Sequence, residues 1–223
     1  MGSPEGEEGR YNNEGPRHRV VIGRRFAIGR YPVTFAEYDR FCEASLRRKP
    51  ADQGWGRERR PVVNVSREDA QDYVAWLSKQ TGKAYRFPTE AEWEYACRAG
   101  TSTPYSFGET IAPKDGNFFQ GGIGSTSEIG AYPANPWGLY NVHGNVWEWV
   151  EDDWHDDYEG APNDGSAWKD EGIDSRSHYF VRRGGSCYFS PSNCRSAYRN
   201  KIEADDRNDD FGFRVARTLS INS

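Results

Sequence analysis

The stretch Asn141-Val-His-Gly-Asn-Val-Trp-Glu-Trp149 decides how this chain is interpreted. Asn141, Asn145 and Glu148 place three oxygen-bearing side chains within eight residues, around a glycine that permits a tight turn. Side-chain oxygens and turn carbonyls suit a hard cation such as calcium. The alternative is a turn whose asparagines bond to their own backbone. Residues 146–150 alternate with a period of two, which predicts a strand directly after the turn.

Composition excludes several classes of protein. Among the 223 residues, Lys and Arg number 29 and Asp and Glu 34, so the net charge is −5. This mild acidity argues against nucleic-acid binding, which needs a concentrated basic surface. Aromatic residues make up 14% of the chain, which excludes wholesale disorder. No apolar run approaches the roughly 20 residues of a membrane span, and we expect a monomer with one domain over residues 1–223.

The cysteines and the N-terminus bear on the compartment. The four cysteines fit neither a disulfide scaffold nor a zinc site, and the N-terminus lacks the apolar core of a signal peptide. We therefore expect a cytoplasmic location by default. Surface display or secretion is expected only if a longer precursor exists.

Three helices are expected before residue 100. Each begins with a capping box, in which a hydroxyl residue is followed three positions later by an acidic one: Thr34 with Glu37, Ser66 with Asp69, and Thr89 with Glu92. Later segments are short and turn-rich, and residues 211–215 alternate as a strand does. Residues 19–22 and 25–28 resemble a hairpin. The fold class is therefore α+β, with two to three helices, few short antiparallel strands and much irregular loop.

A second polar stretch, residues 182–200, carries Cys187 and Cys194 seven positions apart. If their thiols meet, they could form a disulfide or hold a soft metal such as Cu(I). Nearby Arg183 or Arg195 could then lower a thiol pKa. The alternative is that at least one of the cysteines is a small buried apolar residue.

Two further polar features are expected at the surface. His143 shares no ligand spacing with the other histidines, which favours a surface role. Asp152, Asp153, Asp156 and Asp157 form an acidic run of the kind that is usually solvated. They open a turn-rich stretch, residues 152–177, that we expect to be a surface loop.

Seven segments together carry a resemblance to a known family. They are, in order, Met1-Gly-Ser3, Gly29-Arg-Tyr-Pro-Val-Thr34, Pro61-Val-Val-Asn-Val65, Tyr85-Arg-Phe-Pro-Thr-Glu-Ala-Glu-Trp-Glu-Tyr95, Asn141-Val-His-Gly-Asn-Val-Trp-Glu-Trp149, Arg183-Gly-Gly-Ser186 and Gly212-Phe-Arg214. The chain resembles the formylglycine-generating enzyme (sulfatase-modifying factor) superfamily over nearly its whole length. The resemblance implies a C-type-lectin-like fold with little regular secondary structure. The start at Met-Gly-Ser suggests that the first strand usual in the family is missing or was cut off.

The resemblance also implies structural calcium. The side chains of Asn141 and Glu148 and the backbone carbonyls of Gly144 and Val146 would hold it. The family has a second calcium site, which would fall near residues 117–118, but the connecting segment in this chain looks too short for it.

Copper is where this chain departs from the enzymes of the family. Formylglycine-generating enzymes hold Cu(I) between two cysteines five apart, just after Gly-Gly-Ser. Here Cys194 matches the second position, and the first falls at Phe189, which cannot bind copper. We therefore expect no catalytic residues. The alternative is a copper-dependent formylglycine-generating oxidase acting on a cysteine of a protein substrate, with Cys187 in a shifted position and Ser186 and Trp147 lining the site.

A further branch of the family comprises the ligand-binding variable proteins of diversity-generating retroelements, whose exposed positions are rewritten by adenine-specific mutagenesis. The segment at about 183–217 holds many residue types that such mutagenesis reaches. The predicted ligand-binding positions are Cys187, Tyr188, Phe189, Ser190, Ser192, Asn193, Tyr198, Asn200, Asp206, Asn208, Asp209 and Asp210. Tyrosines beside small polar residues are typical of binding loops. We therefore expect a non-catalytic protein that displays a variable surface and binds a protein or cell-surface ligand.

Overall fold

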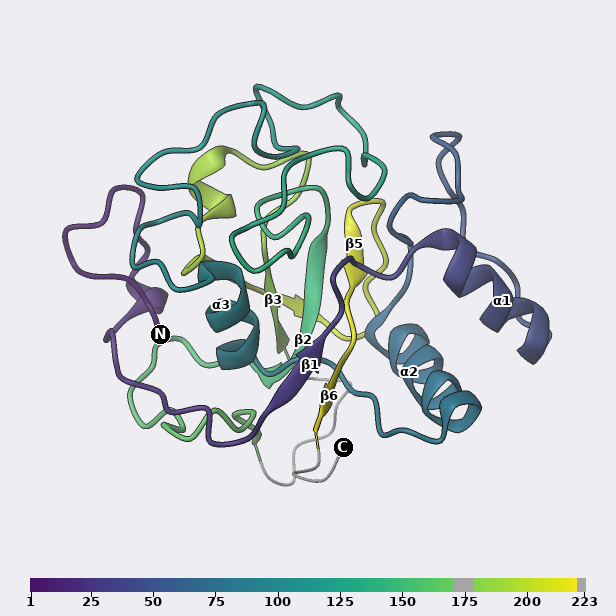
Figure 1. Ribbon diagram of the computed structural model, residues 1–223, viewed down its shortest axis with the longest axis horizontal. Coiled ribbons are helices and arrows are strands. Elements are labelled where there is room, and N and C mark those ends of the chain that lie inside the picture. Colours follow the sequence, from purple (N-terminus) through teal and green to yellow (C-terminus); the bar gives the residue numbers. More distant parts are fainter. Residues whose placement is uncertain (171–178, 220–223) are drawn as a thin grey trace.

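The computed structural model describes residues 1–170 and 179–219. The elements, in chain order, are η1 (Asn12–Glu14), β1 (Phe26–Ile28), α1 (Phe35–Ser45), α2 (Arg67–Thr81), α3 (Glu90–Arg98), β2 (Trp147–Asp153), β3 (Tyr179–Arg183), η3 (Pro191–Cys194), β4 (Arg199–Glu203), β5 (Phe211–Phe213) and β6 (Ala216–Thr218). Figure 1 shows three helices around short strands, joined by long irregular connections. The expected α+β class is confirmed.

The three helices begin where their capping boxes predict. Thr34, Ser66 and Thr89 each accept a hydrogen bond from the backbone N–H three residues on, and the acidic side chain there bonds back. These reciprocal bonds satisfy amide groups that have no partner inside the helix. Gly82 ends α2 in the left-handed conformation, and Ala99 takes that role for α3.

The main sheet has four strands in the order β4-β3-β2-β5. β2 pairs with β3, and β3 with β4, in antiparallel fashion, but β2 and β5 are parallel, unlike the antiparallel strands expected. The reason is that β4 and β5 occupy opposite edges, so the chain recrosses between them. The crossing passes the start of α2, where Arg67 N donates to Ala204 O.

The hairpin expected for residues 19–28 is wrong. β1 pairs with β6, at the other end of the chain, as a separate two-stranded sheet. Residues 19–22 form no strand; Val21 N instead donates to Asn163 O. Both contacts join segments far apart in the sequence, so local alternation alone could not reveal them.

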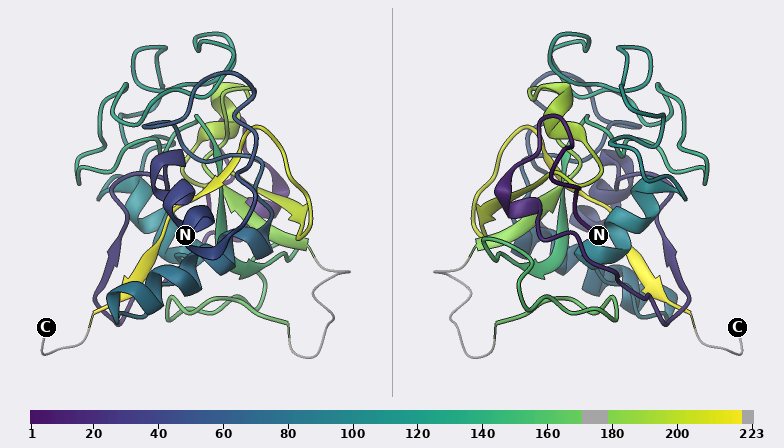
Figure 2. Two further views of the ribbon diagram at one scale, coloured as in Figure 1. Left: turned by 90° about the vertical axis from the view of Figure 1, so that its right-hand side faces the viewer. Right: turned by 90° about the vertical axis from the view of Figure 1, so that its left-hand side faces the viewer.

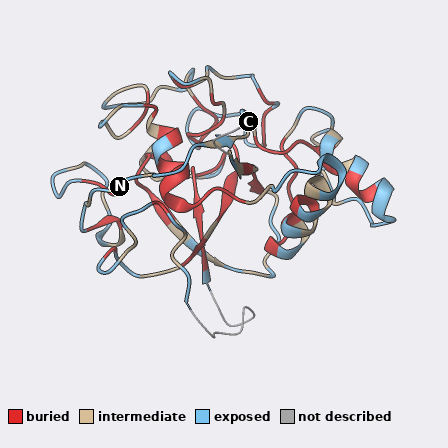
Figure 3. Ribbon diagram, turned by 60° about the horizontal axis from the view of Figure 1, so that its bottom comes forward, coloured by how far each residue is buried: buried red, intermediate tan, exposed pale blue. Residues whose placement is uncertain are grey.

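Two cores lie on opposite faces of the main sheet. Trp147, Trp149 and Phe213 pack with the buried sides of α1 and α2, whereas Val150 and Val181 pack with α3. Side chains alternate between faces along a strand, so the two central strands, β2 and β3, supply both cores. Figure 3 shows the strands as mostly buried and the outer sides of the helices as exposed. No helix in residues 1–170 or 179–219 is long and apolar enough to cross a membrane.

Part of the acidic run expected at the surface is buried. Asp152 and Asp153 lie at the end of β2, and Asp152 accepts hydrogen bonds from Glu90 N and Trp168 N. Burial, with the nearby Glu90 carboxylate, raises the pKa of Asp152 to about 7. The following connection does form a loop up to residue 170, and the rest of the expected loop, 171–177, lies outside the described residues.

Candidate ligand-binding site

The long connections gather at one end of the main sheet, where β2 and β5 begin and β3 ends. Figures 1 and 2 show this end with η3 and residues 101–145 around it. The turn before β2 and the polar stretch after β3 therefore meet there. At this meeting point His143 of the turn bonds to Cys194 O, and Cys187 N donates to Asn145 O.

His143 anchors the turn before β2 and is buried, not at the surface as expected. Its Nε2 accepts a hydrogen bond from Ser106 N at 3.0 Å, so its Nδ1 donates to Cys194 O at 2.8 Å. Burial lowers the pKa of His143 to about 4. The imidazole is therefore neutral at pH 7 and ties the turn to η3.

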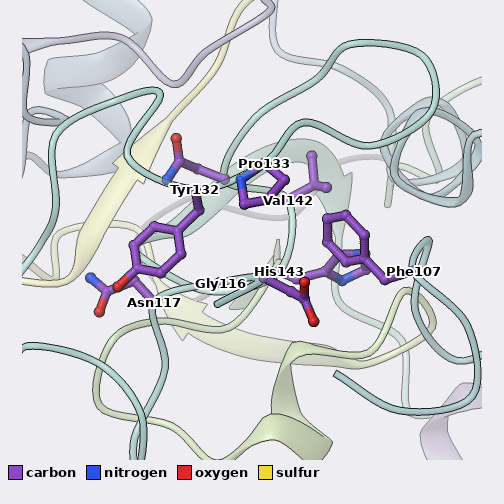
Figure 4. A pocket seen from close by; sticks show the side chains of 9 residues that line it. Phe107, Gly116, Asn117, Tyr132, Pro133, Val142 and His143 are labelled. Carbon is purple, nitrogen blue, oxygen red and sulfur yellow. The ribbon is translucent and has the colours of Figure 1, made fainter. Parts of the chain in front are cut away.

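The asparagines of this turn have different surroundings. Asn145 Oδ1 accepts hydrogen bonds from Ser127 N and Asn117 Nδ2, so its side chain braces neighbouring loops. Asn141 Oδ1 is buried without a partner. Asn141 and His143 help to line a cavity of about 10 Å³, room for about one water molecule, shown in Figure 4.

Glu148 has no carboxylate oxygen to spare for calcium in this geometry. Arg214 donates to both of its oxygens, at 2.5 and 2.6 Å, and Trp93 Nε1 donates at 2.7 Å. The carboxylate is fully buried on the α3 face of the sheet. A cation would have to displace the guanidinium, so the residues present do not fit calcium with Glu148 as a ligand. Calcium binding by Asn141 and the carbonyls of Gly144 and Val146 stays a prediction.

The opposite face of the same strand end forms a second cluster, which we call the sheet-end site. It comprises Trp147, Arg182, Ser186, Phe189, Tyr198 and Asp210. The Trp147 ring centroid lies 5.1 Å from that of Phe189 and 5.8 Å from that of Tyr198. The Arg182 guanidinium carbon lies 4.5 Å from the Trp147 ring and 4.4 Å from the ring of Phe211. The sheet-end site thus contains an arginine side chain that is packed mainly against aromatic rings.

Asp210 supplies the acidic side of the sheet-end site. Ser186 Oγ donates to Asp210 Oδ2 at 2.6 Å, and the backbone carbonyl of Asp210 accepts from Trp147 N. Burial raises the pKa of the Asp210 carboxyl. Burial also lowers the pKa of Arg182 to about 10, against the attraction of Asp210. Each charge is therefore only partly compensated by its surroundings.

Sequence reasoning missed Arg182. The signal was the Arg182-Arg183 doublet in a strand, because neighbouring side chains of a strand point to opposite faces. Arg183 faces α3 and pairs with Glu94, which leaves Arg182 on the face of the sheet-end site.

The twelve predicted ligand-binding residues divide by burial. Cys187, Tyr198 and Asp210 are buried, which corrects the expectation that these positions are exposed; their contact with a ligand stays a prediction. The other nine are exposed or half-buried. Of these, Tyr188 is 41% exposed, and its hydroxyl donates to Asp209 Oδ2.

The two cysteines are poorly suited to act as thiolates. Cys194 is fully buried directly beneath Gly185, where an added Cβ would lie 2.5 Å from its Sγ. Burial raises the pKa of Cys194, and burial together with Asp210 raises that of Cys187 to about 12. Arg195 does not lower either pKa.

The buried Arg195 guanidinium pairs with carboxylates of the N-terminal segment. It bonds both oxygens of Glu14 and one of Glu7. In the part of the chain that the structure describes, no three His, Cys, Asp or Glu side chains are grouped to hold a metal ion.

Comparison with known proteins shows the family to which this chain belongs. The model of the sulfatase-modifying factor enzyme 1-like domain matches residues 1–219. The chain belongs to this family. The formylglycine-generating enzyme of Mus musculus is 35% identical over 181 residues, covering 72% of this chain and 45% of the mouse protein. The chain spans between 36% and 45% of the length of several curated relatives that it matches.

Two solved structures share the fold of this family member. PvdO from Pseudomonas aeruginosa is 40% identical with a TM-score of 0.92, covering 98% of this chain and 90% of PvdO. Treponema denticola variable protein 1 is 26% identical with a TM-score of 0.74, covering 87% and 84% of the two chains. The resemblance drawn from the seven sequence segments, including the C-type-lectin-like fold, is confirmed.

Proposed function

We propose that this chain is a non-catalytic ligand-binding member of its family. The ligand, of protein or cell-surface origin, would contact the sheet-end site and the exposed residues of the following loops. The observation that carries the proposal is Phe189. The resemblance puts Phe189 at the family's first copper position. Its ring packs edge-on against Trp147, so a hydrocarbon contact would stand where the enzymes of the family have a metal ligand.

Surface composition supports the same function. Tyr188, Ser190, Asn193 and Asn200 are exposed or half-buried around the sheet-end site. A tyrosine offers a large contact area at low entropic cost, and small polar residues offer adaptable hydrogen bonds. The buried framework of Arg183, His143 and Glu148 lies beneath them, so substitution at this surface leaves the fold supported.

The response of the protein to copper tests the proposal. We expect the purified protein to leave a cysteine-containing peptide unoxidised when Cu(I) and oxygen are supplied. Titration with Cu(I) should give the same stoichiometry for wild type, Cys194→Ala and the control Cys42→Ala, whose thiol lies in α1. Oxidation of the peptide, with copper binding lost only in Cys194→Ala, would instead support the alternative, a copper-dependent formylglycine-generating oxidase.

A finer proposal concerns the origin of the surface. We propose that a diversity-generating retroelement diversifies the segment at about 183–217. Nine of the twelve positions that adenine-specific mutagenesis could reach are exposed or half-buried. The fold is also shared with a variable protein. Buried Cys187, Tyr198 and Asp210 would then be framework positions.

Sequencing of the gene's surroundings tests this origin. We expect a reverse-transcriptase gene and a near-copy of the segment that differs at adenines. The differences should fall on the nine accessible positions and spare the three buried ones. A neighbourhood without either feature would leave an ordinary, undiversified member of the family.

A further inference from the structure

We infer that the sheet-end site receives a group that carries a carboxylate beside an ammonium, as a free α-amino acid does. The inference rests on the ligand-binding function proposed above and names the chemistry of the ligand. It comes from two opposite charges, Arg182 and Asp210, that are buried near each other without closing into a pair.

Arg182 provides the positive side. The residue is only 8% exposed, and its Nε and Nη1 are buried without a hydrogen-bond partner. A buried charge that lacks hydrogen bonds is costly to the fold. Contacts with the faces of two rings supply attraction to the cation, but they leave its N–H groups without acceptors. A carboxylate is the acceptor that matches a guanidinium best.

Asp210 provides the negative side. Its Oδ2 accepts from Ser186, whereas its Oδ1 is buried and without a partner. Asp209 lies next to it in the chain, and Asp206 is close enough to act electrostatically on Arg182. Because the carboxylates of Asp210 and Asp206 both act on the guanidinium, a ligand that is only anionic would be repelled. A ligand with an added ammonium satisfies the acidic side as well.

Both charges are fixed in place before any ligand arrives. Asp210 is held by Ser186 and through its backbone carbonyl by Trp147 N, and Arg182 is held between the rings of Trp147 and Phe211. The two side chains influence each other's pKa, yet no hydrogen bond or ion pair joins them. Fixed, separated and incompletely paired charges are the arrangement that binds a dipolar group at little reorganisation cost.

The probes that test this inference differ only in charge. L-Phenylalanine carries both charges, 3-phenylpropanoate only the carboxylate, and 2-phenylethylamine only the ammonium. Calorimetry gives the affinities, and the NMR signal of the Trp147 indole N–H reports binding at the site. We expect L-phenylalanine to bind about tenfold more tightly than either analogue, since charge-assisted hydrogen bonds form at both ends.

Variants assign each charge to its partner. In Arg182→Gln, L-phenylalanine should bind no better than 2-phenylethylamine, and in Asp210→Asn no better than 3-phenylpropanoate. Arg30→Gln is the matched control, because Arg30 also lies over two rings, Tyr31 and Tyr140, outside the sheet-end site. Its affinities should equal those of wild type.

The ligand series with wild type decides the inference even if a variant does not fold. Equal binding of L-phenylalanine and one analogue, with the Trp147 signal shifted by both, would overturn the inference and leave the proposed function standing. If none of the three probes moves the Trp147 signal, the inference fails, and the proposed function loses its support at this site.

Discussion

Replacing Glu148 by Ala should lower the free energy of unfolding by about 3–5 kcal/mol, the usual cost of removing one partner of a buried ion pair. The variant leaves the Arg214 guanidinium and the Trp93 indole N–H unpaired inside the sheet–α3 core. The loss arises because an uncompensated buried charge is far less stable than one in water. Urea unfolding followed by circular dichroism measures it.

Glu151→Ala is the control for this variant. Glu151 also lies on β2, but its carboxylate pairs with Lys169 at the surface, and such pairs contribute about 0–1 kcal/mol. A loss below about 1 kcal/mol for Glu148→Ala would contradict the structural role given to the Glu148–Arg214 pair.

A chelator separates that role from calcium binding. If calcium is held with Glu148 as a ligand, chelation lowers the melting temperature of wild type and not that of Glu148→Ala, because ligand binding stabilises the native state. An equal response of both proteins places any bound calcium on other ligands, such as Asn141.

Local signals predicted the parts of the fold that local contacts determine. The capping boxes at Thr34, Ser66 and Thr89 identified all three helix starts, because each bond closes within one helical turn. The pairing of β1 with β6 and the recrossing to β5 depend on segments far apart in the chain. The hydrophobic periodicity of a short stretch of sequence cannot predict such long-range pairings.

The same limit governs the candidate site. Residue types suggested oxygen ligands at Glu148, but its actual partner, Arg214, comes from 66 residues away. Arg182 was overlooked because it looks like an ordinary strand residue until its two ring neighbours, Trp147 and Phe211, are known. The residue types that adenine-specific mutagenesis can produce likewise say nothing of burial. Tyr188 and Tyr198 were therefore grouped together, although only Tyr188 is exposed.

That pair of tyrosines gives the second large expected effect. Tyr198→Ala should destabilise the fold by about 3–5 kcal/mol, as is usual when a large buried aromatic side chain is truncated to alanine. Tyr198 is 7% exposed, and its ring packs against Trp147 at 5.8 Å and edge-on against Tyr11 at 5.3 Å. The truncation would open a cavity beneath the sheet-end site that the neighbouring rings cannot fully fill. Urea unfolding measures the loss.

Tyr188→Ala supplies the matched comparison, with the same chemical change ten residues away. Its side chain is 41% exposed, and its hydroxyl bonds to Asp209 at the surface. Its stability should therefore stay within about 1 kcal/mol of wild type. Equal losses in the two variants would contradict this division of the segment into a buried framework and an exposed surface. Unequal losses in the expected order would identify Tyr188, and not Tyr198, as the tyrosine that can vary without loss of the fold.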